Sequence, residues 1–387
     1  MIQDDCYEEV VSMIKGAMKE IGCGNTKYLD IECGPVINSA AQYKLQSYID
    51  KARRNNQIIE ELDIKSKIGF FVSPTLIRLE SMDDIHEEFF GPILHVLSYK
   101  DDELEKTIDQ LNSKGFGLTF GIHSRIEKKV KDISLRVNAG NIYINRNQIG
   151  AVVGSQPFGG EGLSGTGPKA GGPNSLHGYS QNILSRERSN HTVFLSDDPI
   201  DARELLPSSL QLSNELLLKL KRAFPNIEED FFEFLYQEVL KYSSDILLPG
   251  PTGESNQLSY KPKGTVLCLG PEPDELLKQT LLSLFLGNSV ICPISSKDCN
   301  ILNELGFKKE NILRLNDSPS MSLLVSNLYS AVFYSGNSTS MQEIILASRS
   351  ELITIVSSIY EAWELLKEQV VTEDTTASGG NANLLAL

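Results

Sequence analysis

The sequence predicts an α/β protein: a parallel sheet with flanking helices in the first half, then a second α/β unit. Short apolar runs alternate with amphipathic helical stretches between residues 94 and 144, and the alternation returns from residue 264. The 387 residues are enough for two domains. Apolar residues make up 41% and charged residues 22%, which is ordinary for globular proteins that bury a core.

The first half is predicted to begin with two helices. Residues 5–21 carry apolar side chains at helical spacing and stop at Gly22, and a second helix follows Ser39, a suitable N-cap. We then predict strands at residues 69–72, 94–99, 118–122 and 141–144, and helices at residues 103–111 and 126–137. The β-α-β-α-β order of the later elements predicts a largely parallel sheet.

The second half follows a polar, charged stretch at residues 186–207 that we predict to be a linker. A helical region at residues 210–242 is expected to break at Pro225. Further strands are predicted at residues 266–269, 289–292 and 331–334, and helices at residues 275–286 and 341–347. The predicted domains are residues 1–185 and 208–371, with a tail at residues 372–387.

The composition excludes several classes of function. A net charge of -15 argues against non-specific binding to nucleic acid or anionic membranes. The sequence contains no run of about 18 apolar residues, so no transmembrane segment is predicted. The six cysteines form no Cys-x-x-Cys pair and the five histidines are isolated, so no metal site is predicted. The acidic N-terminus is unlike a signal peptide, and the expected location is the cytoplasm.

The most informative segment runs from Asn145 to Gly172 and holds nine of the 29 glycines. Glycine costs conformational entropy and adds nothing to a core, so this density predicts backbone that turns tightly or closely approaches a ligand. The segment follows a predicted strand, where α/β proteins commonly place sites. Residues 164–167 lack the Lys-[Ser/Thr] ending of a phosphate-binding loop and are expected to be loop architecture.

This segment resembles the aldehyde dehydrogenase superfamily, and more narrowly the glutamate-γ-semialdehyde (pyrroline-5-carboxylate) dehydrogenase module of the proline utilization A family. Residues 88–92 are similar to the superfamily's Glu-x-Phe-Gly-Pro motif, and residues 34–37 and 115–118 fit the same order. Residues 248–256 and 376–382 are similar to segments of the long family members. The resemblance implies the C-terminal half of an aldehyde dehydrogenase module, followed by a degenerate aldehyde-dehydrogenase-like domain of Rossmann type.

The resemblance implies roles for five residues. Glu88 matches a carboxylate that accepts hydrogen bonds from the nicotinamide ribose, and Phe90 would pack near the nicotinamide. Gly150 and Ala151 match a loop whose backbone amides hold the α-carboxylate of the substrate. Phe158 would flank the aliphatic stem of the aldehyde. Each residue also has a structural interpretation: a solvated acidic run for Glu88, a tight turn for Gly150 and Ala151, and core packing for the phenylalanines.

The family's reaction needs a thiolate nucleophile, a general-base glutamate and a dinucleotide-binding half. The resemblance implies that all three precede Met1, so no catalytic residue is expected in this chain. Cys6 lies within the first predicted helix and lacks the loop that follows the nucleophile. Cys23 and Cys33 flank a turn and are expected to be structural, and Asn145 is expected to hold loop backbone through its amide.

The second unit departs from the cofactor-binding pattern that it resembles. Pro273 or a neighbour replaces an oxyanion-stabilising asparagine, and Cys292 replaces the adenosine-ribose lysine. Met341 replaces the last glycine of the family's Gly-Ser-Thr-x-x-Gly loop, where a bulky side chain would block a pyrophosphate. The unit is therefore expected to have lost its cofactor and to serve the structure, by covering a substrate channel or stabilising assembly.

The leading hypothesis is part of an NAD-dependent L-glutamate γ-semialdehyde dehydrogenase of proline catabolism, supplying the substrate-carboxylate anchor. NAD is the implied cofactor, and FAD belongs only to the family's proline dehydrogenase part. The implied partners are a small aldehyde substrate, an upstream half that carries the catalytic cysteine, and further copies in an oligomer. The alternatives are a non-catalytic split-gene remnant or scaffold subunit, and an unrelated α/β protein with an anion-binding loop.

Overall fold

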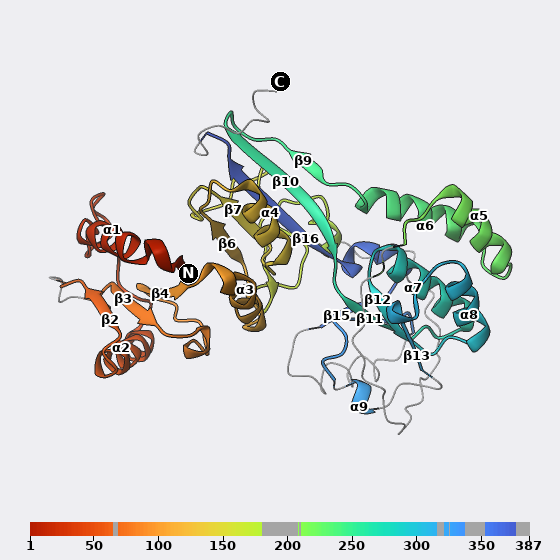
Figure 1. The fold of residues 1–387 in the computed structure, drawn as a ribbon, viewed down its shortest axis with the longest axis horizontal. Coiled ribbons are helices and arrows are strands. Elements are labelled where there is room, and N and C mark those ends of the chain that lie inside the picture. The colour runs from red at the N-terminus through yellow and green to blue at the C-terminus, as the bar shows by residue number, and fades with distance from the viewer. Residues whose placement is uncertain are drawn as a thin grey trace. The chain divides into compact units, whose positions relative to one another are not determined.

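The computed structural model describes residues 1–64, 69–179, 208, 210–315, 321–324, 326–336 and 353–376 (Figure 1). The chain divides into two compact units, Met1–Lys114 and Gly115–Leu387. The predicted linker and the predicted helix at residues 341–347 lie outside the described residues. The predicted domain limits at residues 185, 208 and 371 stay predictions.

The first unit is a four-stranded sheet with a helix on each face. Its strand order is β1 (Ile2–Gln3), β4 (Ile93–Tyr99), β3 (Thr75–Leu79), β2 (Ile58–Glu61). Its α-helices are α1 (Tyr7–Lys19), α2 (Ser39–Arg54) and α3 (Leu104–Ser113). Leu76 packs with Val11 of α1, and the next residue, Ile77, packs with Ala52 of α2. Successive side chains of a strand point to opposite faces, so α1 and α2 cover different faces.

Two predictions in this unit are wrong. No strand forms at residues 69–72, and β3 begins instead at Thr75. Pro74 has no N–H to donate to a ladder, which explains why the strand starts after it. The N-cap of α2 is Asn38, whose Oδ1 accepts a 2.9 Å hydrogen bond from the Ala41 N–H, and Ser39 is the first helical residue.

The second unit contains a mixed sheet that joins distant parts of the chain. Its order is β6 (Thr119–Ile122), β7 (Asn141–Ile144), β16 (Leu366–Asp374), β10 (Glu254–Pro262), β9 (Ile246–Leu248). β16 pairs in parallel with β7 and antiparallel with β10. α4 (Glu127–Arg136) connects β6 to β7. The predicted single sheet through residues 94–99, 118–122 and 141–144 is therefore wrong, because its first strand belongs to the other unit.

A second sheet of this unit is entirely parallel. Its order is β13 (Ile312–Arg314), β12 (Ser289–Cys292), β11 (Thr265–Cys268), β14 (Ala331–Phe333), β15 (Thr354–Val356). In chain order this is the 3-2-1-4-5 arrangement of a Rossmann-type fold. The predicted fold class is confirmed. The α-helices here are α5 (Asn214–Ala223), α6 (Glu229–Tyr242), α7 (Pro273–Phe285), α8 (Ser296–Glu304) and α9 (Met321–Leu324).

The helical region is interrupted at Pro225 as predicted, between α5 and α6. A two-stranded pair, β5 (Phe116–Gly117) and β8 (Glu161–Gly162), ties the glycine-rich segment to the residues before β6. The described 3-10 helices are Asp4–Cys6, Met82–Asp84, Asp101–Glu103, His177–Tyr179, Lys309–Asn311 and Ile359–Leu365.

Candidate functional site

The loop that follows β7 contains the predicted carboxylate anchor. Gly150 has φ +71°, and a Cβ built on it would meet nothing within 4 Å. The glycine is therefore needed for its backbone conformation and not for packing. Ile149 and Val153 are 86% and 91% exposed, and Ala151 is half-buried. The loop presents an open turn on the surface of the unit.

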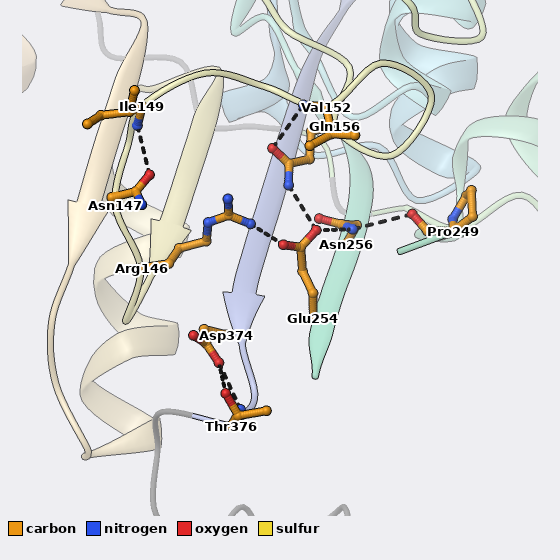
Figure 2. Close-up of polar contacts among 10 residues, drawn as sticks. All are labelled: Arg146, Asn147, Ile149, Val152, Gln156, Pro249, Glu254, Asn256, Asp374 and Thr376. Carbon is orange, nitrogen blue, oxygen red and sulfur yellow. Dashed lines mark hydrogen bonds and ion pairs between the residues drawn. The ribbon is translucent and has the colours of Figure 1, made fainter. Parts of the chain in front are cut away.

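The start of this loop is fixed by side-chain amides. Asn145 has φ 55°, and its Oδ1 accepts a 3.0 Å hydrogen bond from the Ser124 N–H while its Nδ2 donates to the Ser124 carbonyl at 3.1 Å. Asn147 Oδ1 accepts from the Ile149 N–H at 3.1 Å (Figure 2). The predicted structural role of Asn145 is confirmed.

Both sides of the loop meet at one carboxylate, Glu254, at the start of β10. Arg146, before the turn, forms an ion pair with Glu254, and Gln156, after it, donates to Glu254 Oε1 at 2.9 Å (Figure 2). Gln156 Oε1 in turn accepts from the Val152 N–H at 3.3 Å. Local sequence patterns do not predict this network, because about a hundred residues separate its partners.

The end of the loop is held on β7 by Asn141, which is fully buried. Its Nδ2 donates to the Pro157 carbonyl at 2.9 Å, and its Oδ1 accepts from the Gly159 N–H at 3.2 Å. Phe158 lies between them, half-buried, and its backbone exchanges hydrogen bonds with Ala170 at 3.0 and 2.9 Å. This backbone pairing fixes the position of Phe158 relative to the anchor turn.

The other two predicted site residues lie in the first unit. Glu88 is exposed, and Phe90 is 87% exposed. The neighbouring Phe89 instead stacks on Tyr48, with ring centroids 3.7 Å apart. Phe90 is therefore not a core residue, and its ring is accessible to a ligand. The binding roles of all five predicted residues stay predictions.

In a parallel sheet of this order, a dinucleotide would bind beyond the carboxyl ends of β11 and β14. Pro271 and Pro273 remove two amide donors where β11 leads into α7, and the first turn of α7 carries Asp274 and Glu275. Ser335, after β14, donates to Glu275 at 3.1 Å and accepts from Gln279 at 2.8 Å. Missing donors and negative charge disfavour a pyrophosphate, so the residues described at this edge do not fit a dinucleotide.

A separate cavity of about 420 Å³ lies between the glycine-rich segment and the C-terminal elements. Burial lowers the pKa of Lys169 and of Lys263 to about 8. Burial and the neighbouring Glu361 raise the pKa of Glu364 to about 7. Lys169 Nζ donates to Asn141 at 3.1 Å and also to the Gly159 carbonyl, so it supports the loop end described above.

Glu364 is expected to make stability depend on pH. Its folded-state pKa of about 7 lies above its ordinary value of 4.5, so its contribution to stability is present below pH 4.5 and is lost as pH rises through 7. Glu364→Gln should be more stable than the parent at about pH 8 by on the order of 2 kcal/mol, allowing for partial exposure, with little difference at low pH. Urea unfolding of both proteins at several pH values tests this, and parallel pH profiles would contradict it.

The three cysteines of the first unit lie in different environments. Cys6 is exposed and directly precedes α1. Cys23 and Cys33 are half-buried neighbours on paired backbone, and burial together with Cys33 raises the pKa of Cys23 to about 11. A raised thiol pKa disfavours the thiolate, which supports a structural role for Cys23.

The part of the chain that the structure describes contains neither a metal-binding cluster nor a membrane-spanning helix. No group of three or more His, Cys, Asp or Glu side chains there could hold a metal ion. None of the helices described is both long enough and apolar enough to cross a bilayer.

Comparisons with known proteins give a consistent result. Residues 1–183 match the aldehyde dehydrogenase family. The chain is 32% identical to the bifunctional protein PutA of Escherichia coli (strain K12), over 100% of this chain and 30% of that protein. It is 32% identical to the 1-pyrroline-5-carboxylate dehydrogenase of Bacillus subtilis (strain 168), over 46% of this chain and 34% of that protein.

A solved PutA structure from Corynebacterium freiburgense superposes with a TM-score of 0.61 at 21% identity, covering 94% of this chain and 34% of that one. This likeness supports the fold. The chain thus spans about 30% of the length of the curated PutA relatives that it matches.

Proposed function

Because the chain belongs to the aldehyde dehydrogenase family, which its residues 1–183 match, we propose that it supplies part of an NAD-dependent L-glutamate γ-semialdehyde dehydrogenase of proline catabolism. The open turn at Gly150 carries this proposal. Gly150 has the positive φ of a glycine turn, a Cβ added to it would meet no described atom within 4 Å, and hydrogen bonds hold both sides of the loop. Backbone amides presented in this way suit an α-carboxylate.

The other predicted residues keep the roles that the family resemblance implies for them. Phe158 packs along the aliphatic stem of the substrate, and Glu88 accepts hydrogen bonds from ribose hydroxyls of NAD, which supplies the hydride acceptor when bound. The exposed ring of Phe90 offers an apolar surface beside the nicotinamide. The nucleophilic cysteine, the general base and the dinucleotide-binding half come from an upstream segment of the kind found in the longer PutA relatives.

The proposal is tested by co-expressing the full chain with an upstream half that carries the cysteine. The purified complex is expected to reduce NAD with glutamate-γ-semialdehyde, while either half alone and a complex with the cysteine replaced by serine do not. NADH absorbance gives the rate.

A complex that forms but does not turn over would refute the proposal and favour the scaffold alternative. The polar network of Ser335 at the edge of the parallel sheet supports that alternative, because the residues described at this edge do not fit a dinucleotide.

A further inference from the structure

We propose that Glu254 is a positioning residue that sets the conformation of the substrate-anchor loop from β10, in the C-terminal part of the chain. This inference rests on the proposed function, because it concerns the same Gly150 turn. In this proposal Glu254 does not itself contact the substrate. It acts through Arg146 and Gln156, which flank the turn (Figure 2).

The Glu254 carboxylate lies between donors from both sides of the loop. Arg146 approaches Oε2, while Gln156 and Asn256 both donate to Oε1 at 2.9 Å. Gln156 extends the network to the backbone of the turn, because its own Oε1 accepts a hydrogen bond from the Val152 N–H, two residues after Gly150. The carboxylate therefore links the residues before the turn to the residues after it.

The chemistry at this point requires a carboxylate. The side chains of Arg146 and Glu254 are only 18% and 14% exposed, so water cannot readily replace either partner. A glutamine at residue 254 would place an N–H₂ group among donors, and would leave the buried guanidinium without a counter-charge. Among the described residues Arg146 Nε already has no hydrogen-bond partner, although the guanidinium lies 5.6 Å from the Tyr143 ring centroid.

The backbone of Glu254 is itself held firmly. Gly253 before it has φ +87°, and the Glu254 N–H donates to the Pro251 carbonyl at 3.1 Å, closing a turn. Glu254 is then the first residue of the β10–β16 ladder, opposite Asp374. β16 pairs on its other side with β7, the strand that leads into the loop. One sheet thus fixes both the carboxylate and the loop that it holds.

The first experiment uses the full chain alone. Hydrogen–deuterium exchange of the amides at residues 152–156 is expected to be about tenfold faster in Glu254→Gln than in the parent, corresponding to the loss of a hydrogen bond to a charged group. Glu373→Gln is the matched control, because Glu373 lies on the adjacent strand and has no part in the network. Equal exchange in Glu254→Gln and the parent would overturn the inference.

The second experiment uses the complex with the upstream half and two aldehydes. Glu254→Gln should raise KM for glutamate-γ-semialdehyde about tenfold, while kcat/KM for propanal, which has no α-carboxylate, should stay unchanged. Glu254→Asp, which keeps the charge, should recover part of the loss. Equal losses with both aldehydes would overturn the inference and leave Glu254 a purely structural residue.

The carboxylate anchor at Gly150 and the positioning role of Glu254 are refuted by different results. A parent complex that shows no preference for glutamate-γ-semialdehyde over propanal would refute the carboxylate anchor itself. A parent complex that has the preference and a Glu254→Gln complex that retains it in full would refute only the role of Glu254.

Discussion

Gly150→Val is expected to lower kcat/KM for glutamate-γ-semialdehyde by about 10- to 100-fold in the complex with an upstream half, which is the effect of losing one hydrogen bond to a charged group. Two causes act together. A β-branched residue disfavours the φ of +71° that this turn uses, and its side chain would occupy the space from which a carboxylate approaches the amides. The chain should still fold, since nothing lies within 4 Å of the new Cβ. Steady-state kinetics with semialdehyde and propanal measure the loss.

Gly154→Val is the control for backbone strain. Gly154 lies in the same loop, has φ +83°, and also has no atom within 4 Å of its Cβ position. The local conformational penalty is therefore similar at both positions. The anchor assignment requires the Gly150 variant to lose much more activity with the semialdehyde than the Gly154 variant, and equal losses would contradict it.

Gly140→Ala is expected to reduce the free energy of unfolding by about 3 kcal/mol. Gly140 directly precedes β7, and an added Cβ would overlap the Gly159 carbonyl and the Lys169 ammonium group. Neither can move freely, because Lys169 Nζ is bonded to Asn141 and to the same carbonyl. The substitution must displace either the loop end or β7. Urea unfolding followed by circular dichroism measures the change.

Gly16→Ala is the comparison variant, and it should change the free energy of unfolding in the opposite direction. Gly16 lies within α1, and its added Cβ would meet nothing within 4 Å, so the change should stabilise the first unit by roughly 0.5–1 kcal/mol. If both alanine substitutions shifted stability in the same direction, close packing at Gly140 would not be the explanation.

Local signals in the sequence located several elements well. The strands at residues 141–144 and 289–292 were predicted with the bounds that the structure gives, because short apolar runs there are bounded by glycine, asparagine or proline. The prediction at residues 69–72 failed where Pro74 shifted the strand to later residues. Apolar content alone did not reveal that shift, whereas the missing N–H of the proline could have.

Long-range partners were beyond the reach of these signals. Nothing near residue 146 indicates that its guanidinium meets a carboxylate at residue 254. The motif at residues 248–256 marked the right segment but not its contact. Likewise, alternation predicted strands at residues 94–99 and 118–122 correctly, but did not show that they belong to different sheets. Pairing depends on tertiary contacts that short-range periodicity does not encode.

The placement of β16 has a consequence for synthesis of the protein. β7 emerges from the ribosome more than two hundred residues before the strand that pairs with it, Leu366–Asp374. Until β16 is synthesised, neither β7 nor β10 can form its hydrogen bonds with that strand. Unpaired edges invite pairing with other chains, and contacts of such high sequence separation form slowly. Release of the nascent chain before residue 366 would therefore leave an aggregation-prone intermediate, and chaperone protection is most needed during this stretch of translation.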